Sequence, residues 1–130
     1  MPHFVIEYSA NLDGRVDFKA LCSEILAVML QSGLFERGAV RVRARQVSDY
    51  AIADELPENA FIDMALRIGV GRSAEEKSSL GDVIFKCVSE RLADLFLTPY
   101  FALSFEIREI DPKLSWKKNA IHPRLRADGS

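Results

Sequence analysis

Apolar and polar side chains alternate in four stretches of the chain, which is the period expected of a half-buried β-strand. These stretches are residues 3–9, 39–47, 61–70 and 101–107. In the first stretch, Phe4, Ile6 and Tyr8 share one face, while Glu7 and Ser9 lie on the other. We therefore predict four strands, each with one face directed toward a core.

Two longer stretches place apolar residues at every third or fourth position, as on one face of a helix. The first begins after Asp17, whose carboxylate can cap a helix N-terminus, and ends at Gly33. The second begins at Ser73 and Glu76, which form an S-x-x-E capping box, and its apolar stripe extends to Phe96. We therefore predict one helix after the first strand and one after the third.

The order of these elements is β-α-β followed by β-α-β. We predict a single α+β domain over residues 1–130, with one unit in residues 1–47, a second in residues 60–110 and a basic arm in residues 111–130. A helical crossover joins parallel strands, so each unit should contribute a parallel pair. This order fits the ferredoxin-like fold, whose members range from sensors to RNA-binding modules and enzymes, so the fold does not choose a function.

Composition and charge exclude several classes of partner. The 130 residues carry a formal net charge of -2, so the basic excess that drives binding to a phosphate backbone is missing. The polar strand faces carry residues such as Arg43 and Asp63 instead of the exposed aromatic side chains that stack on RNA bases. No apolar run approaches the roughly 20 residues of a membrane span, and the start does not resemble a signal peptide. We expect a cytoplasmic protein that binds neither nucleic acid nor membrane.

The basic arm, residues 111–130, holds five basic and two acidic side chains. Leu114 and Trp116, the single tryptophan of the chain, would give the arm apolar surface to bury. We therefore expect the arm to be ordered.

The cysteines and histidines do not suggest a metal centre. Cys22 and Cys87 fall on the predicted apolar helix stripes, where a free cysteine acts as a small buried hydrophobe. Together with His3 and His122 they give no spacing typical of zinc ligands. We expect buried, inert thiols and no metal.

The arginines suggest an organic acid as ligand. Residues 69–73 lead from a strand into a capped helix, where backbone N–H groups and the planar fork of Arg72 suit a carboxylate. A tight turn with two glycines explains the same pattern. Arg41, Arg43 and Arg45 would share a strand face about 7 Å apart, so their charges require anions or water nearby. Solvated or paired structural arginines would satisfy that requirement, and so would a ligand with several carboxylates.

Pro2 stands at the head of the first strand. An initiator methionine before proline is generally removed in the cytoplasm, which would expose the secondary amine of the proline. Burial and nearby arginines both disfavour the ammonium form, so they would lower the pKa of this amine from about 8. A neutral amine near pH 7 can act as a general base.

Four segments of the chain carry a family resemblance in combination: Pro2 to Ser9, Val40 to Arg43, Phe61 to Arg72, and Ala102 to Ile107. Together they resemble the 5-carboxymethyl-2-hydroxymuconate isomerase family of the tautomerase superfamily, in matching order from Pro2 to about His122. The resemblance implies two β-α-β units related by a pseudo-twofold axis, with the helices on one face of a four-stranded sheet. This replaces the ferredoxin-like assignment. It also implies a homotrimer and a reaction that needs no cofactor.

The same resemblance implies roles for three residues. Pro2 would be the catalytic base that moves a proton between carbons of 5-carboxymethyl-2-hydroxymuconate or a related unsaturated polycarboxylate, in aromatic-acid catabolism such as homoprotocatechuate degradation. Arg41 and Arg72 match the substrate-binding arginines of the family. By analogy, residues 116–122 would cover the pocket of a neighbouring subunit. Two alternatives stay open: a tautomerase of different substrate specificity, and a non-catalytic trimer that binds anionic metabolites.

Overall fold

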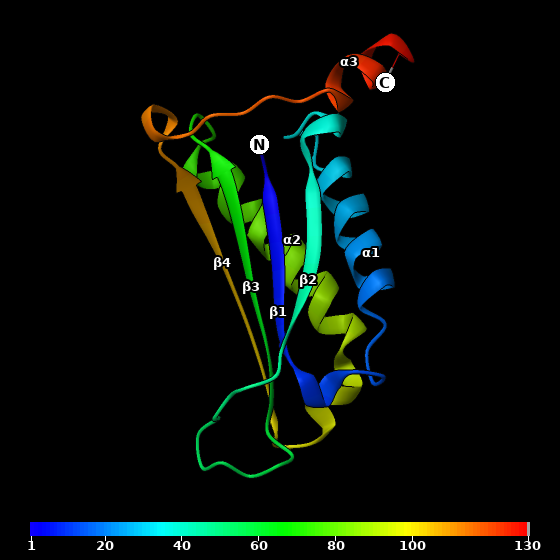
Figure 1. Ribbon diagram of the computed structural model, residues 1–130, viewed down its shortest axis with the longest axis vertical. Helices are drawn as coiled ribbons and strands as arrows, with labels where there is room; N and C mark the ends of the chain where they lie inside the picture. Colours follow the sequence, from blue (N-terminus) through cyan, green and yellow to red (C-terminus); the bar gives the residue numbers. More distant parts are fainter. Residues whose placement is uncertain (130) are drawn as a thin grey trace.

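Four strands form one mixed sheet in the computed structural model of the protein, which describes residues 1–129 (Figure 1). They are β1 (His3–Ser9), β2 (Arg41–Val47), β3 (Ala60–Gly69) and β4 (Phe101–Ile110). Their order across the sheet is β2-β1-β3-β4. β1 is parallel to β2 and β3 is parallel to β4, whereas β1 and β3 are antiparallel. The predicted strands and their parallel pairs are confirmed.

The central antiparallel pair relates the two β-α-β units by a pseudo-twofold axis. Phe4 of β1 lies opposite Leu66 of β3, and Ile6 lies opposite Met64. In the ferredoxin-like arrangement another strand separates the two strands of each unit, whereas here they are direct neighbours. The fold is therefore the one implied by the family resemblance, that of the tautomerase superfamily.

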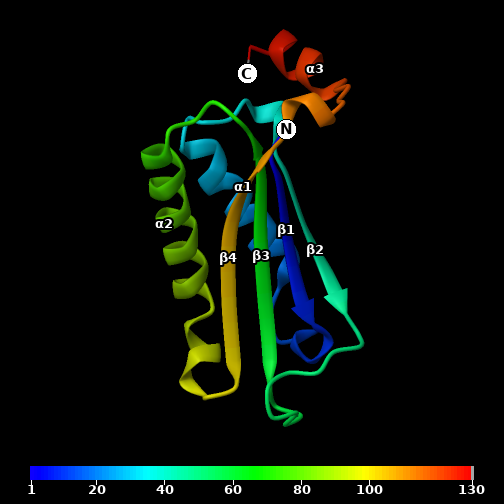
Figure 2. The same ribbon diagram turned by 90° about the vertical axis from the view of Figure 1, so that its left-hand side faces the viewer.

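Two long helices cover one face of the sheet, and within residues 1–129 no helix covers the other (Figures 1 and 2). They are α1 (Phe18–Gln31) and α2 (Ala74–Arg91). The Asp17 carboxylate accepts a hydrogen bond from the backbone N–H of Ala20 at 3.0 Å, and Ser73 and Glu76 form the predicted capping box. The predicted helix starts are thus confirmed.

The prediction that the second helix continues to Phe96 as a single α-helix is wrong. α2 ends at Arg91, and Ala93–Leu97 forms a separate 3₁₀ helix, η3. The N–H of Leu92 reaches the carbonyls of both Val88 and Glu90, so the chain tightens at this point. Over a single turn, a 3₁₀ helix and an α-helix give nearly the same apolar spacing.

The core lies between the sheet and the two helices. Strand residues with no exposed surface pack against buried positions of α1 and α2. From the strands these are Phe4, Ile6, Ile62, Met64, Leu66 and Ile68, and from the helices Leu21, Ile25, Met29, Leu80, Ile84 and Val88. Each such side chain stabilises the fold by about 1.5–3 kcal/mol through burial alone. The alternation seen in the sequence therefore corresponds to the core face of the sheet.

The two thiols are less buried than predicted. Cys22 and Cys87 are both half-buried and free. Cys87 lies between α1 and α2 and donates to the carboxylate of Glu24 at 3.1 Å. Burial and this carboxylate raise the pKa of the Cys87 thiol to about 11. The thiol is therefore protonated near neutral pH.

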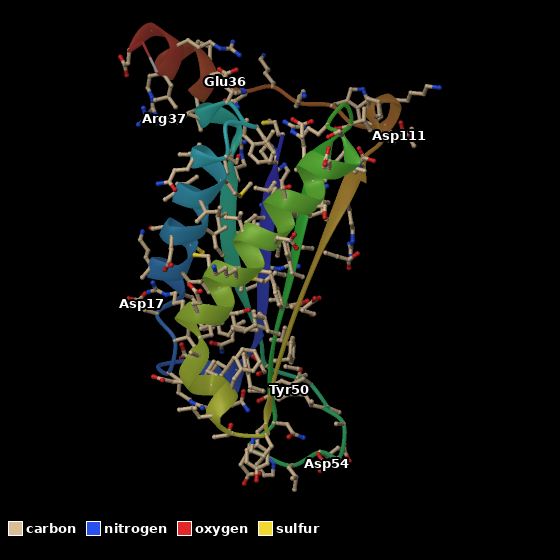
Figure 3. All side chains as sticks on the ribbon, turned by 180° about the vertical axis from the view of Figure 1, so that it is seen from behind. Asp17, Glu36, Arg37, Tyr50, Asp54 and Asp111 are labelled. Carbon is tan, nitrogen blue, oxygen red and sulfur yellow. The ribbon has the colours of Figure 1, made fainter. Side chains whose placement is uncertain are left out.

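The basic arm crosses the end of the sheet at which β1 begins, and ends in α3 (Ile121–Ala127), which packs against η2 (Arg37–Ala39) (Figure 1). The arm is ordered, but the prediction that its apolar residues are buried is wrong within this chain. Trp116 is 86% exposed and Leu114 is 72% exposed. Polar contacts to Glu36 and Gly38 hold the arm instead. The loop of residues 48–59 lies at the opposite end of the sheet, with Tyr50 and Asp54 (Figure 3). None of the helices in residues 1–129 has the length and apolar character needed to cross a membrane.

Candidate active site

Pro2 is buried at the start of β1, in the wall of a cavity of about 490 Å³ at the end of the sheet crossed by the arm. Because β1 and β3 are antiparallel, the first residue of β1 and the end of β3 lie side by side, as the pairing of His3 with Arg67 shows. The turn that follows β3 carries Arg72 to the same cavity. The lining residues are Met1, Pro2, Phe35, Glu36, Ala39, Gly69, Val70, Arg72, Lys117, Asn119, His122, Pro123 and Arg126.

The backbone holds Pro2 in place on one side. Its carbonyl accepts a hydrogen bond from the N–H of Arg41 at 3.2 Å, which continues the pairing of β1 with β2. Met1 is present in this structure, so the Pro2 nitrogen is part of a peptide bond. A peptide nitrogen is not basic, and the nitrogen becomes an amine only when Met1 is removed.

Hydrogen bonds within the protein hold the Arg72 side chain, and the guanidinium keeps N–H groups that these bonds do not use. Its Nη1 donates to the carbonyl of Gly69 at 3.3 Å and its Nη2 to that of Leu34 at 2.8 Å. The guanidinium lies 4.7 Å from the centre of the Phe35 ring, and its Nε is buried with no hydrogen-bond partner among residues 1–129. Each Nη carries a second N–H beyond those bonds. The guanidinium is therefore both structurally paired and able to bind an anion.

The arginines predicted to share one face of β2 contact different groups of the protein. Arg41 does not line the cavity itself, but its Nη1 reaches the Met1 sulfur at 3.0 Å and the carbonyl of Ala39 at 2.6 Å. Nη1 of Arg43 lies 3.2 Å from Nδ1 of His3. Of the two, Arg41 is the one directed toward the N-terminus.

The N-terminus lies in a positive field. Burial lowers the pKa of the Met1 amino group, and Lys117, Arg72 and Arg41 lower it further by charge repulsion. Burial also lowers the pKa of His3, with added repulsion from Arg67 and Arg43. The site therefore disfavours a cation at the N-terminus and favours an anion.

Two residues of the arm, Lys117 and Asn119, belong to this site, although the sequence did not single them out. Lys117 is the strongest of the charges acting on the N-terminal amine. The Asn119 amide donates to the carbonyl of Gly38 at 2.9 Å and lies 3.5 Å from the Met1 sulfur. Its Oδ1 accepts from the N–H groups of Ile121 and His122 at the start of α3. The excess of basic residues in the arm was the available signal, but it did not distinguish Lys117 from its neighbours.

Glu36 ties α3 to the cavity wall, and it lies beside this helix in Figure 3. Its two oxygens accept from Nε and Nη2 of Arg126, both at 2.6 Å, and one of them lies 3.0 Å from Nδ1 of His122. The hydrogen bond from Arg126 lowers the pKa of the Glu36 carboxyl. Within this chain, the arm therefore covers the pocket of its own subunit.

The capping box takes up part of the predicted backbone anion site at the N-terminus of α2. The Glu76 carboxylate accepts from the N–H of Ser73 at 2.9 Å, and the Ser73 hydroxyl accepts from the N–H of Glu76 at 3.0 Å. The capping box therefore already supplies an anion there. Gly71 has a φ of +116°, so the tight-turn interpretation of this segment holds.

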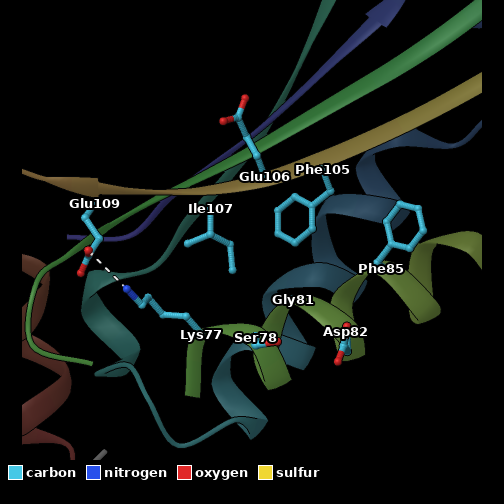
Figure 4. Close-up of a pocket in the computed structure, with 9 residues that line it drawn as sticks. All are labelled: Lys77, Ser78, Gly81, Asp82, Phe85, Phe105, Glu106, Ile107 and Glu109. Carbon is cyan, nitrogen blue, oxygen red and sulfur yellow. Dashed lines mark ion pairs between the residues drawn. The ribbon is translucent and has the colours of Figure 1, made fainter. Parts of the chain in front are cut away.

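A second cavity, of about 560 Å³, lies between α2 and β4 (Figure 4). Phe85 and Phe105 lie in its wall, and its lysine, Lys77, is paired with Glu109 at 3.3 Å. Asp82 and Glu106 add further negative charge. An organic polyanion would be repelled there, so the cavity at Pro2 is the better candidate.

Comparison with known proteins yields close relatives. The family described as 5-carboxymethyl-2-hydroxymuconate isomerase matches residues 2–125. A 5-carboxymethyl-2-hydroxymuconate Delta-isomerase of Escherichia coli is 34% identical over 122 residues, which cover 94% of this chain and 97% of that protein. The crystal structure of a 5-carboxymethyl-2-hydroxymuconate isomerase from Deinococcus radiodurans R1 is 38% identical, with a TM-score of 0.90 and coverage of 96% and 94%.

A more distant solved structure shares the fold. It is described as a fused wild-type 4-OT symmetric trimer, is 13% identical, and covers 89% of this chain and 93% of its own, with a TM-score of 0.65. At this identity the likeness concerns the fold.

Proposed function

Because this chain belongs to the 5-carboxymethyl-2-hydroxymuconate isomerase family and is therefore an isomerase, we propose that it shifts a proton in 5-carboxymethyl-2-hydroxymuconate or a closely related unsaturated polycarboxylate. The observation that carries the proposal is the meeting of Pro2 with Arg72 and Lys117 in the wall of one cavity, with Arg41 close enough to act on the N-terminal amine. Such a site combines a potential base with several cations. The reaction requires no metal or organic cofactor.

Pro2 is the general base in this proposal. Removal of Met1 turns its nitrogen into a secondary amine at the wall of the cavity. Burial and three cations lower the pKa of the Met1 amine. We expect them to act in the same direction on the Pro2 amine, which lies one residue along the chain in the wall of the same cavity. A neutral amine removes a proton from a carbon of the conjugated acid and returns that proton to another carbon, so the product is an isomer.

Cationic side chains bind the substrate in this proposal. Arg41 and Arg72 hold carboxylates, and Lys117 adds a third cation from the arm. As the proton leaves carbon, negative charge spreads onto the neighbouring oxygen atoms as a dienolate. Positioned donors in a partly buried site stabilise this charge more than water does.

The proposed assembly is a homotrimer. The sheet face without helices and the exposed Trp116 leave surface that a second subunit could cover. The symmetric trimer with the same fold supports this assignment. In such an assembly, residues 116–122 would also lie near a neighbouring subunit.

The test uses protein whose loss of Met1 is verified by intact mass. Conversion of the muconate is followed by its ultraviolet spectrum, and we expect Pro2→Ala to lower kcat/KM by about 10²–10⁴-fold. Because protonation removes the base, kcat/KM of the parent protein should fall as the pH is lowered through the depressed pKa of the amine. Protein that retains Met1 serves as an inactive control.

Two results would contradict this function. Undiminished turnover by the Pro2→Ala protein would remove Pro2 from the mechanism. Binding of the muconate by verified Met-free protein without spectral change would instead favour a non-catalytic protein that binds anionic metabolites.

A further inference from the structure

The side chain of Met1 occupies a position at which two donors converge. Arg41 Nη1 lies 3.0 Å from the Met1 sulfur, and Asn119 Nδ2 lies 3.5 Å from it. A thioether sulfur is a weak hydrogen-bond acceptor, whereas a guanidinium forms its strongest hydrogen bonds with carboxylates. A carboxylate would therefore be a stronger acceptor for these two donors than the Met1 sulfur is.

The remaining hydrogen bonds of these donors fix their direction. Arg41 Nη1 uses its other proton on the carbonyl of Ala39 at 2.6 Å. Asn119 Nδ2 uses its other proton on the carbonyl of Gly38 at 2.9 Å, while its oxygen is held by the backbone of α3. Arg41 Nη1 and Asn119 Nδ2 thus each have one N–H beyond these bonds, and in both cases it is directed at the Met1 sulfur.

We infer that Arg41 and Asn119 form a carboxylate subsite of the proposed substrate, and that the Met1 thioether fills this subsite until Met1 is removed. The inference rests on the proposed function for the identity of the ligand as a polycarboxylate. Asn119 is then a substrate-binding residue contributed by the arm. Removal of Met1 has two consequences, because it exposes the Pro2 nitrogen and also empties the subsite.

The experiment compares two forms of the full chain that differ at the first residue. One retains Met1, and the other carries Ala at this position, produced by proteolytic cleavage of an N-terminal fusion. In both forms the Pro2 nitrogen is blocked, so catalysis plays no part in the result. The probe is adipate, a saturated dicarboxylate that cannot be isomerised, and its binding is measured by isothermal titration calorimetry. We expect the Ala form to bind adipate at least tenfold more tightly, and equal affinities would overturn the inference.

A second substitution tests Asn119 itself. Asn119→Asp keeps an oxygen to accept from Ile121 and His122, but replaces the donor with a negative charge. We expect it to weaken adipate binding at least tenfold in the Ala form and less than threefold in the Met1 form, in which the sulfur already blocks the subsite. A purely structural role in the arm would weaken both forms equally, and that outcome would overturn the assignment of Asn119. Lys118→Ala, at the exposed neighbouring position, is the control and should leave both affinities unchanged.

These outcomes are separable from failure of the proposed function. Loss of the isomerase assignment would appear as absent turnover in Met-free protein. Loss of the subsite would appear as equal adipate affinity in the two blocked forms.

Discussion

At the scale of the residue, neighbours of the same type have different surroundings. Lys117 and Lys118 are adjacent in the arm and both exposed, yet Lys117 lines the cavity and acts on the N-terminal amine. Arg41 reaches the Met1 sulfur, whereas Arg43 lies beside His3. Composition alone treats these residues as equivalent, because charge repulsion depends on distance and not on residue type.

The two lysines provide a matched pair of variants. Lys117→Ala removes a cation near the base, so we expect KM for the muconate to rise by about three- to tenfold, equivalent to about 0.7–1.4 kcal/mol. The pKa of the Pro2 amine should also rise, because a charge that repels its protonated form is lost. The decline of kcat/KM on acidification should therefore begin at a higher pH. Steady-state kinetics across pH measures both effects, and a change of equal size in Lys118→Ala would contradict this role for Lys117.

At the scale of the element, the arm depends on a close approach at Gly38. A Cβ atom at this position would lie 2.9 Å from Nδ1 of His122 and 3.1 Å from its backbone. Backbone atoms cannot move aside as easily as the end of a flexible side chain. Glycine at this position therefore permits α3 to pack against η2, and the packing places Lys117 and Asn119 at the cavity.

We expect Gly38→Ala to displace the arm. Amide hydrogens of α3 should exchange faster with solvent, and KM should rise while the core helices keep their protection. Gly81→Ala is the control, because its Cβ would meet Ile107 at an ordinary 3.5 Å and alanine favours the interior of α2 by about 1 kcal/mol over glycine. Unchanged exchange in α3 of the Gly38→Ala protein would show that the arm tolerates the added methyl group.

At the scale of the whole molecule, the chain leaves surface that an assembly would cover. Trp116 and Leu114 are exposed in the arm, and one face of the sheet has no helix over it in residues 1–129. Large exposed apolar side chains and open sheet surfaces are common where subunits meet. The proposed homotrimer accounts for both features.

Sedimentation velocity tests the assembly directly. We expect a single species of about three times the 14.6 kDa mass of the chain at micromolar concentration. Trp116 is the sole tryptophan, so its fluorescence reports on the arm, and its emission should shift to longer wavelength when the assembly is dissociated. A monomeric mass with unshifted emission on dilution would contradict a trimer that covers Trp116.

The sequence by itself determined the elements of the fold and part of the site. The strands, the caps at Asp17 and Ser73, and the positions of Pro2 and the arginines followed from it, because periodicity and capping are set by residues close together in the chain. The predictions of fully buried thiols and of a continuous second helix were wrong. The exposure of a side chain and a change to 3₁₀ geometry both depend on neighbouring elements.

Only the tertiary structure decided which residues surround Pro2. The antiparallel pairing of β1 with β3 brings the N-terminus beside the turn that holds Arg72. The contact between Gly38 and Asn119 joins residues 81 positions apart, so no local pattern could indicate it. Contacts of this kind depend on the packing of the whole chain. Lys117 and Asn119 lie at the cavity because the arm crosses the end of the sheet.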